Sequence, residues 1–292
     1  MDMTKKLLGA DHIDTLISMA YLAITYKNQG RWNEAEQLQI QVLEMTKKLL
    51  GADHLDTLTS MANLAITYRN QGRWNEAEQL EIQVMDMRKK LLGADHPDTI
   101  RGIGNLAATY WNQRKWNEAE QLQIQVMDMR KKLLGAEHPD TLVSMANLAS
   151  TYRRQRRLNE AEQLEIQVMD MAKKILGADH PNTLISMANL ASTYRNQGRW
   201  NEAEQLEIQV MGMRKKLLGL DHPDTFISMA NLASTYRSQG RLNEAEQLEI
   251  QVVDMAKKIL GVDHPDTLIY MENLACTYRD QRRHQENMKV LN

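Results

Sequence analysis

Residues 54–95 read HLDTLTSMANLAITYRNQGRWNEAEQLEIQVMDMRKKLLGAD, and residues 96–137 read HPDTIRGIGNLAATYWNQRKWNEAEQLQIQVMDMRKKLLGAE. The second stretch repeats the first 42 positions later without insertion or deletion, and the same segment recurs along the whole chain of 292 residues. A fixed period of roughly 20 to 50 residues is typical of solenoids and repeat arrays. The sequence therefore predicts a repeat array rather than one or two globular domains.

The period divides the chain into copies that we expect to form a single repeat domain over residues 1–292. Residues 1–11 match the end of a copy, six full copies follow, and a partial seventh closes the sequence. The full copies, first to sixth, are residues 12–53, 54–95, 96–137, 138–179, 180–221 and 222–263, and the partial seventh is residues 264–292.

The first half of each copy has the spacing of a helix, here named helix A. In the second copy Leu58, Met61 and Ala65 recur at intervals of three and four residues, which places them on one helical face. The helix is expected over residues 56–71. Gly72 is expected to end it, because glycine readily takes the left-handed conformation found after helices.

The second half of the copy predicts another helix, named helix B. Ala77, Val84 and Leu91 form an apolar stripe, and Asn75 with Glu78 has the spacing of a capping box at the helix start. One helix pair cannot bury the apolar faces of helix B alone, whereas stacked pairs can. The predicted fold is therefore all-α, a right-handed α-solenoid of antiparallel helix pairs.

Three copies lack the turn glycine. Arg114, Arg156 and Arg282 occupy the position of Gly72. If the backbone there is left-handed, each arginine costs about 1 kcal/mol relative to glycine.

The repeated motif resembles a known family. Asn63-Leu64-Ala65-x-x-Tyr68 followed by Gly72-x-Trp74-x-x-Ala77 is similar to the tetratricopeptide repeat, and the length of 42 residues resembles the variant of kinesin light chains and of fungal NB-ARC–TPR proteins. The resemblance implies protein–protein interaction, with an extended peptide held in a concave groove lined by the A helices.

A second stripe on helix A supplies the candidate peptide-binding residues. It holds a series of asparagines, whose amides both donate and accept hydrogen bonds, and a series of cations, which bind carboxylates; Trp111 replaces the cation in the third copy. The asparagines are Asn63, Asn105, Asn147, Asn189, Asn231 and Asn273, and the cations are Lys27, Arg69, Arg153, Arg195, Arg237 and Arg279. The predicted ligand is an extended, acidic peptide. In the alternative, the asparagines bond within the stack and the arginines form a solvated face.

Other functions find little support in the composition. The net charge is −2, which argues against nucleic acid or an anionic membrane as the partner, and no apolar run is long enough for a membrane span. The histidine that opens each copy is expected to take part in capping rather than metal binding. No catalytic set is evident, and the lone Cys276 aligns with serines. We therefore expect a cytoplasmic binding module without metal, cofactor or enzymatic activity.

A second function remains open from the sequence. Residues 1–8 match the last third of a helix B, and residues 284–292 occupy the first half of another. Ends of this kind expose stacking surface, and a contact between unlike ends can propagate. The alternative to a peptide receptor is therefore a scaffold that associates end to end.

Overall fold

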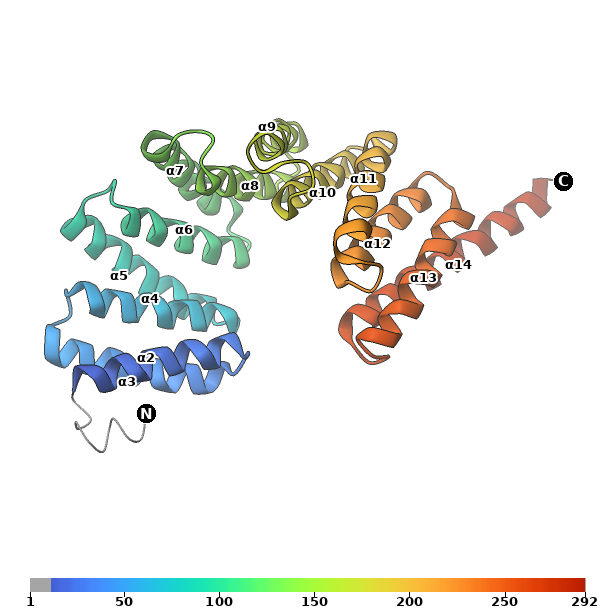
Figure 1. The fold of residues 1–292 in the computed structure, drawn as a ribbon. Helices are drawn as coiled ribbons and strands as arrows, with labels where there is room; N and C mark the ends of the chain where they lie inside the picture. The colour runs from blue at the N-terminus through green and yellow to red at the C-terminus, as the bar shows by residue number, and fades with distance from the viewer. Residues whose placement is uncertain (1–11, 292) are drawn as a thin grey trace. The chain divides into compact units, whose positions relative to one another are not determined.

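The computed structural model describes residues 12–291, with side chains for residues 12–282. This part of the chain contains thirteen α-helices and no strand, arranged as consecutive packed pairs (Figure 1). The predicted all-α solenoid of helix pairs is confirmed. The predicted end of a helix B at residues 1–11 lies outside the described residues.

Each of the six full copies contributes one helix A and one helix B, and the partial seventh copy contributes a helix A. The A helices are α2 (Ile13–Asn28), α4 (Leu55–Asn70), α6 (Pro97–Asn112), α8 (Pro139–Arg154), α10 (Pro181–Asn196), α12 (Pro223–Ser238) and α14 (Pro265–Leu291). The B helices are α3 (Trp32–Leu50), α5 (Trp74–Leu92), α7 (Trp116–Leu134), α9 (Leu158–Leu176), α11 (Trp200–Leu218) and α13 (Leu242–Ile259).

The chain divides into two compact units, Met1–Gln155 and Arg156–Asn292. In the first, named unit 1, each of the helices α2 to α8 packs against the next, as the blue-to-green ribbon of Figure 1 shows. In the second, named unit 2, α9 to α14 pack in the same way. A single domain over the whole chain stays a prediction.

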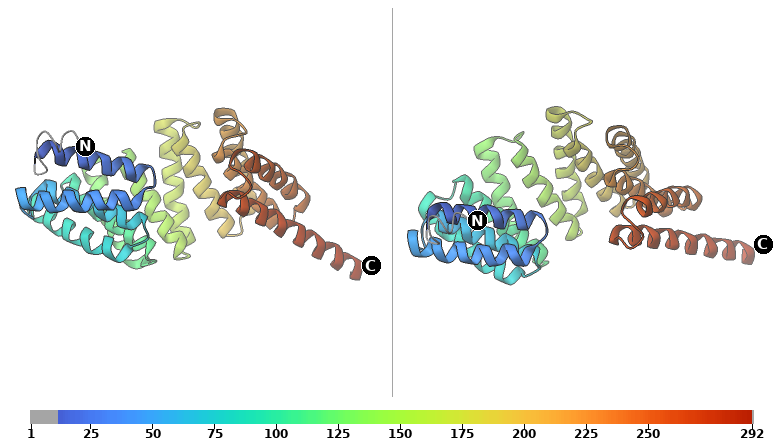
Figure 2. Two further views of the ribbon diagram at one scale, coloured as in Figure 1. Left: turned by 90° about the horizontal axis from the view of Figure 1, so that it is seen from below. Right: turned by 60° about the horizontal axis from the view of Figure 1, so that its bottom comes forward.

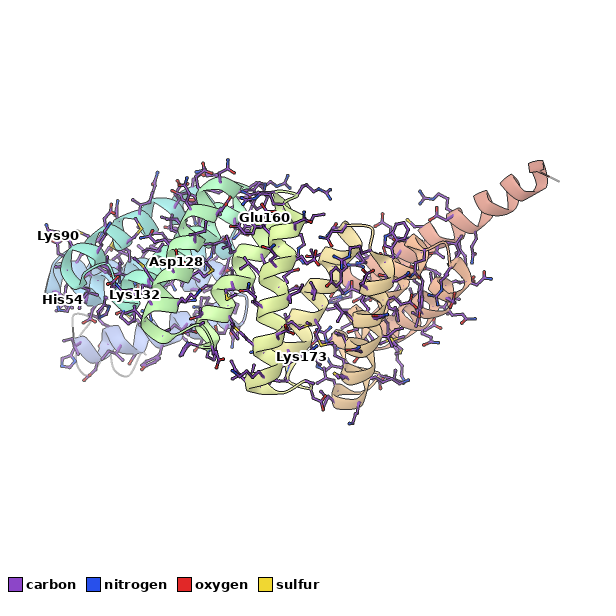
Figure 3. All side chains as sticks on the ribbon, turned by 90° about the horizontal axis from the view of Figure 1, so that it is seen from above. His54, Lys90, Asp128, Lys132, Glu160 and Lys173 are labelled. Atoms are coloured by element: carbon purple, nitrogen blue, oxygen red, sulfur yellow. The ribbon has the colours of Figure 1, made fainter. Side chains whose placement is uncertain are left out.

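The start of every helix A explains the histidine motif. His54 is the N-cap of α4, and its Nδ1 accepts a hydrogen bond of 3.2 Å from the backbone N–H of Asp56. The hydroxyl of Thr57 donates to the carbonyl of Gly51 at 2.8 Å, which fixes the preceding loop. Figure 3 shows His54 and Lys90 at the edge of unit 1 where B helices end and A helices begin. The expected capping role of the histidine is confirmed.

The start of helix B differs from the prediction. The helix α5 begins at Trp74 with Arg73 as N-cap, and no side chain caps it. The capping box of Asn75 and Glu78 is therefore wrong. Glu78 instead accepts hydrogen bonds from Gln113, at 2.7 Å, and from a lysine of the next copy, so neighbouring copies compete with local capping for this carboxylate.

The turn between the helices is left-handed, as predicted, at two of the three arginines that replace glycine. The φ angle is 62° at Arg114 and 64° at Arg156, compared with 77° at Gly72. The prediction for Arg282 is wrong, because α14 continues through this position to Leu291 as one helix of 27 residues (Figure 2). No separate helix B begins after it within the described residues.

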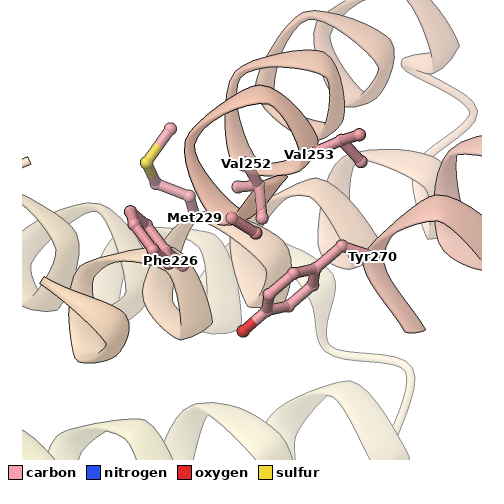
Figure 4. Packing of buried hydrophobic residues seen from close by; sticks show 6 residues of the cluster. Phe226, Met229, Val252, Val253 and Tyr270 are labelled. Atoms are coloured by element: carbon pink, nitrogen blue, oxygen red, sulfur yellow. The ribbon is translucent and has the colours of Figure 1, made fainter. Parts of the chain in front are cut away.

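Within each unit the core lies between neighbouring A and B helices and continues from copy to copy. In unit 2, Phe226 and Val252 are almost fully buried and pack together with Tyr270 of the next copy (Figure 4). The predicted stripe of helix B is confirmed at Ala77 and Val84. It is wrong at Leu91, which is 46% exposed near the end of the helix.

Candidate functional site

The turn between helices A and B holds neighbouring copies together. The amide of Gln71 donates to Glu36 of the preceding copy at 2.8 Å, and the guanidinium of Arg73 donates to the same carboxylate at 2.6 Å. Arg73 also lies over the ring of Tyr68, 4.1 Å from its centroid. These turn residues of the repeated motif therefore stabilise the stacking of copies, and few of their polar groups remain for a ligand.

We number the junctions between copies after the earlier copy, so that the second junction joins the second and third copies. There Arg69 lies 3.6 Å from Glu81 of its own copy and donates to the backbone carbonyl of Asn105 in the next A helix at 3.1 Å. Thr109 of that helix donates to Glu81 at 2.5 Å. The guanidinium thus bridges two A helices above a carboxylate that is only 3% exposed.

The same arrangement recurs in unit 2. At the fifth junction Arg195 lies 3.6 Å from Glu207 and donates to the carbonyl of Asn231. At the sixth junction Arg237 lies 4.0 Å from Glu249 and donates to the carbonyl of Asn273. We call these three junctions closed, because an arginine spans the space between adjacent A helices.

Burial dominates the electrostatics of the closed junctions. Removal from water raises the pKa of Glu81, and the hydrogen bond from Thr109 and the charge of Arg69 offset part of that increase. The pKa values of Glu207 and Glu249 are raised for the same reason. Each arginine therefore compensates a buried carboxylate of its own array.

The third junction is built differently and contains a pocket of about 550 Å³ between α6, α7 and α8. Of the predicted site residues, the structure brings together Asn105, Trp111 and Asn147 in its lining. The lining also includes Arg101, Gly104, Ala108, Gln123, Arg130 and Ser144, and it contains no carboxylate. We call a junction of this kind, without an arginine–glutamate pair, open.

Trp111 forms one wall of this pocket. Its ring packs edge-on against Trp116 of α7, with 5.5 Å between centroids, and the guanidinium of Arg154 in α8 lies 5.4 Å from its centroid. The indole therefore contacts both neighbouring helices. Unlike the closed-junction arginines, Trp111 leaves space over Gln123, whose Oε1 accepts a hydrogen bond from Thr151 at 2.7 Å.

The remaining predicted residues do not converge on this pocket. Asn63 lines a cavity of about 20 Å³ at the first junction, beside the buried Gln39. Arg279 lies near Cys276, with 3.7 Å between its Nη2 and the sulfur atom. Arg153 lies at the end of α8 in unit 1, and Asn189 lies in α10 of unit 2. A peptide-binding role for these residues stays a prediction.

Sequence reasoning missed Arg101, Gln123 and Arg130 as site residues. A signal was present for one of them, because residue 123 is glutamine in the same copy in which tryptophan replaces the arginine twelve positions earlier. The pocket contribution of Arg101 and Arg130 depends on how three helices meet, which the period alone does not specify.

Neither a metal-binding cluster nor a membrane-spanning helix is present among the described residues. No group of three or more His, Cys, Asp or Glu side chains there could hold a metal ion. None of the described helices has the length and apolar character needed to cross a membrane.

Comparison with known proteins decides the family. Models of the tetratricopeptide repeat match residues 16–90, 98–174, 183–224 and 225–266, which is most of the chain. The chain belongs to the tetratricopeptide repeat (TPR) family. TPR arrays mediate protein–protein interaction and serve as scaffolds for it. No protein of curated function matches the sequence.

Solved structures agree with this TPR assignment. An array of nearly identical TPR-like repeats from a kinesin light chain-like protein of Podosopora anserina is 34% identical, with a TM-score of 0.63 over 70% of this chain and 97% of that one. BtubC (BKLC) from P. vanneervenii is 17% identical, with a TM-score of 0.67 over 80% and 94%. The apo form of the quorum sensor NprR from B. thuringiensis is 14% identical, with a TM-score of 0.60 over 95% and 80%. The last two show likeness of fold alone.

Proposed function

We propose that this TPR array binds an extended, acidic peptide segment of a partner protein along the A helices of unit 1. The pocket at the third junction is the anchor. It is concave, it combines an apolar wall with a few polar groups, and such sites are the usual places where ligands bind.

The charge of the pocket carries the proposal. Arg101 and Arg130 line it, and no aspartate or glutamate does. Arg101 is 61% exposed and forms an ion pair of 2.7 Å with Asp98 on its own helix. Because a solvent-exposed ion pair is weak, a ligand carboxylate can compete with Asp98 for the guanidinium. Arg130 donates to the backbone carbonyl of Asp140 and to Ser144, which holds it in place. Two arginines in a lining without carboxylates favour an acidic ligand, and Asp98 outside the lining shares the charge of Arg101.

Peptide capture tests the proposal. An acidic peptide selected from a library is expected to bind the wild-type chain, and its affinity should fall when its acidic residues are replaced by glutamine or asparagine. The variant Arg101→Glu should weaken binding by about tenfold, since a charge reversal at an exposed site changes the interaction by about 1.4 kcal/mol or more.

The matched control is Lys90→Glu, which makes the same charge change at an exposed residue outside the pocket. Calorimetric titration should give wild-type affinity for this control. Equal affinities of Arg101→Glu, Lys90→Glu and the wild type would remove the pocket as the anchor. A screen in which no peptide binds the wild-type chain would contradict the proposed function as a whole.

End-to-end self-association is a second candidate function, and the exposure of α14 supports it. Leu268 is 52% exposed and Met271 is 37% exposed, whereas Leu58 and Met61, at the same positions of the second copy, are 1% and 5% exposed. The apolar side chains on this face of α14 are therefore exposed, whereas a helix B covers the equivalent side chains in earlier copies. We propose that a helix B of a second chain covers this face.

Sedimentation at increasing concentration tests this candidate. Self-association should raise the mean mass with concentration, and Leu268→Glu should abolish the rise. A wild-type chain that stays monomeric at high concentration would exclude it.

A further inference from the structure

The copies fall into two classes according to a pair of positions twelve residues apart. Four copies have arginine followed by glutamate, and two have another residue followed by glutamine. The first class is Arg69 with Glu81, Arg153 with Glu165, Arg195 with Glu207 and Arg237 with Glu249, and the second is Lys27 with Gln39 and Trp111 with Gln123. The second residue of the pair is buried in helix B in all six copies. A buried carboxylate without a cation is costly, so the neutral amide accompanies the loss of arginine.

The arginine–glutamate pair also closes the array to ligands at its junction. At the fifth junction Arg195 contacts the carboxylate of Glu207 below it and the carbonyl of Asn231 on the next A helix. Its side chain is only 23% exposed. An acidic group approaching there meets a guanidinium that is already neutralised, with a carboxylate beneath it.

The third junction has the opposite properties. Gln123 gives the pocket an uncharged floor, and Trp111 does not bridge to the carbonyl of the next asparagine as arginine does. Gly104 and Ala108 line the same space and take up little of it. A Cβ atom placed on Gly104 would meet nothing within 4 Å, so the glycine borders open space.

The first junction also has a glutamine in place of the buried glutamate, but its residues at the positions of Gly104 and Ala108 are larger. Gln39 is 5% exposed, and neither atom of its amide has a hydrogen-bond partner among the described residues. The cavity beside it is only about 20 Å³, with Ala20 and Ile24 at the positions that Gly104 and Ala108 hold in the third copy. This volume is close to that of one water molecule. The first junction therefore lacks an arginine–glutamate pair, but its cavity is too small for a ligand side chain.

We propose that an acidic side chain of the ligand enters the third junction, and that Gln123 determines this selectivity. The neutral amide of Gln123 does not repel an anion, as glutamate would. The absence of the bridging arginine leaves room for the acidic side chain. The arginine–glutamate junctions hold the array together and take no part in binding. This inference rests on the proposed function and restricts it to one junction.

Installing the closed pair in the third copy tests the inference. The variant Trp111→Arg/Gln123→Glu adds one positive and one negative charge, so the net charge is unchanged. It reproduces a pair that the chain already holds at three described junctions, and its melting temperature should therefore not fall. Titration with the acidic peptide should show affinity at least tenfold weaker than that of the wild type.

The matched control is Lys27→Arg/Gln39→Glu, which installs the same pair at the first junction and should leave affinity within about twofold. Wild-type affinity of Trp111→Arg/Gln123→Glu would overturn the inference. If Arg101→Glu still lost binding in that case, the proposed function would stand without the selectivity assigned to Gln123. Failure of any acidic peptide to bind the wild-type chain would overturn both.

Discussion

The second and third junctions lie side by side in unit 1 and have nearly the same sequence, yet they differ in construction. At the second, Arg69 fills the space between A helices and compensates Glu81. At the third, Trp111 and Gln123 occupy the two positions, and a pocket opens. In an array of near-identical copies, a residue that is the same in every copy mostly serves the packing between copies. Residues that differ from the shared pattern together in one copy indicate where a ligand can bind.

The largest effect is expected from removing the cation of a closed junction. Arg195→Leu leaves Glu207 buried without its partner and should lower the free energy of unfolding by about 3 kcal/mol, measured by denaturant unfolding. The double variant Arg195→Leu/Glu207→Gln should recover most of this loss, because it restores the neutral floor found in the third copy. A double variant as unstable as the single one would show that the two positions are not coupled.

A smaller effect is expected from pH. Burial raises the pKa of Glu207 above its ordinary value of 4.5, so the folded state holds this proton more tightly than the unfolded state. The contribution of Glu207 to stability is therefore largest below pH 4.5 and falls as pH rises to its raised pKa, by at most about 1.4 kcal/mol per pH unit. The stability of the wild type relative to Glu207→Gln should decline across this window. A difference that stays flat or grows with pH would contradict the assignment.

The smallest effect concerns the turns of the third and fourth copies. Arg114→Gly and Arg156→Gly remove side chains from left-handed positions and should each raise stability by about 1 kcal/mol, visible as a higher melting temperature. The reverse change, Gly198→Arg, should cost a similar amount, since Gly198 has a φ of 76°. A lower melting temperature for both glycine variants would mean that the arginines contribute contacts worth more than the strain.

The period and the apolar spacing were sufficient to predict the helix pairs and their order, because each copy repeats the same local signals. They failed where contacts between copies override local ones: Glu78 binds the next copy instead of capping its own helix. They also failed at Arg282, where α14 continues instead of turning. The candidate site was predicted in part. The pocket contains Trp111, Asn105 and Asn147 of the predicted binding stripe. The arginines of the closed junctions instead pair with buried glutamates, and the spacing of residues along the sequence did not predict these pairs.

The location of the bound peptide tests the central claim most directly. An acidic peptide with a photoreactive group should be cross-linked to the wild-type chain and the modified residues identified by mass spectrometry. The open-junction account predicts that the cross-links fall on α6 and α8, between Arg101 and Ser150, around the pocket of the third junction. Cross-links concentrated on α10 and α12, near Arg195 and Arg237, would contradict it.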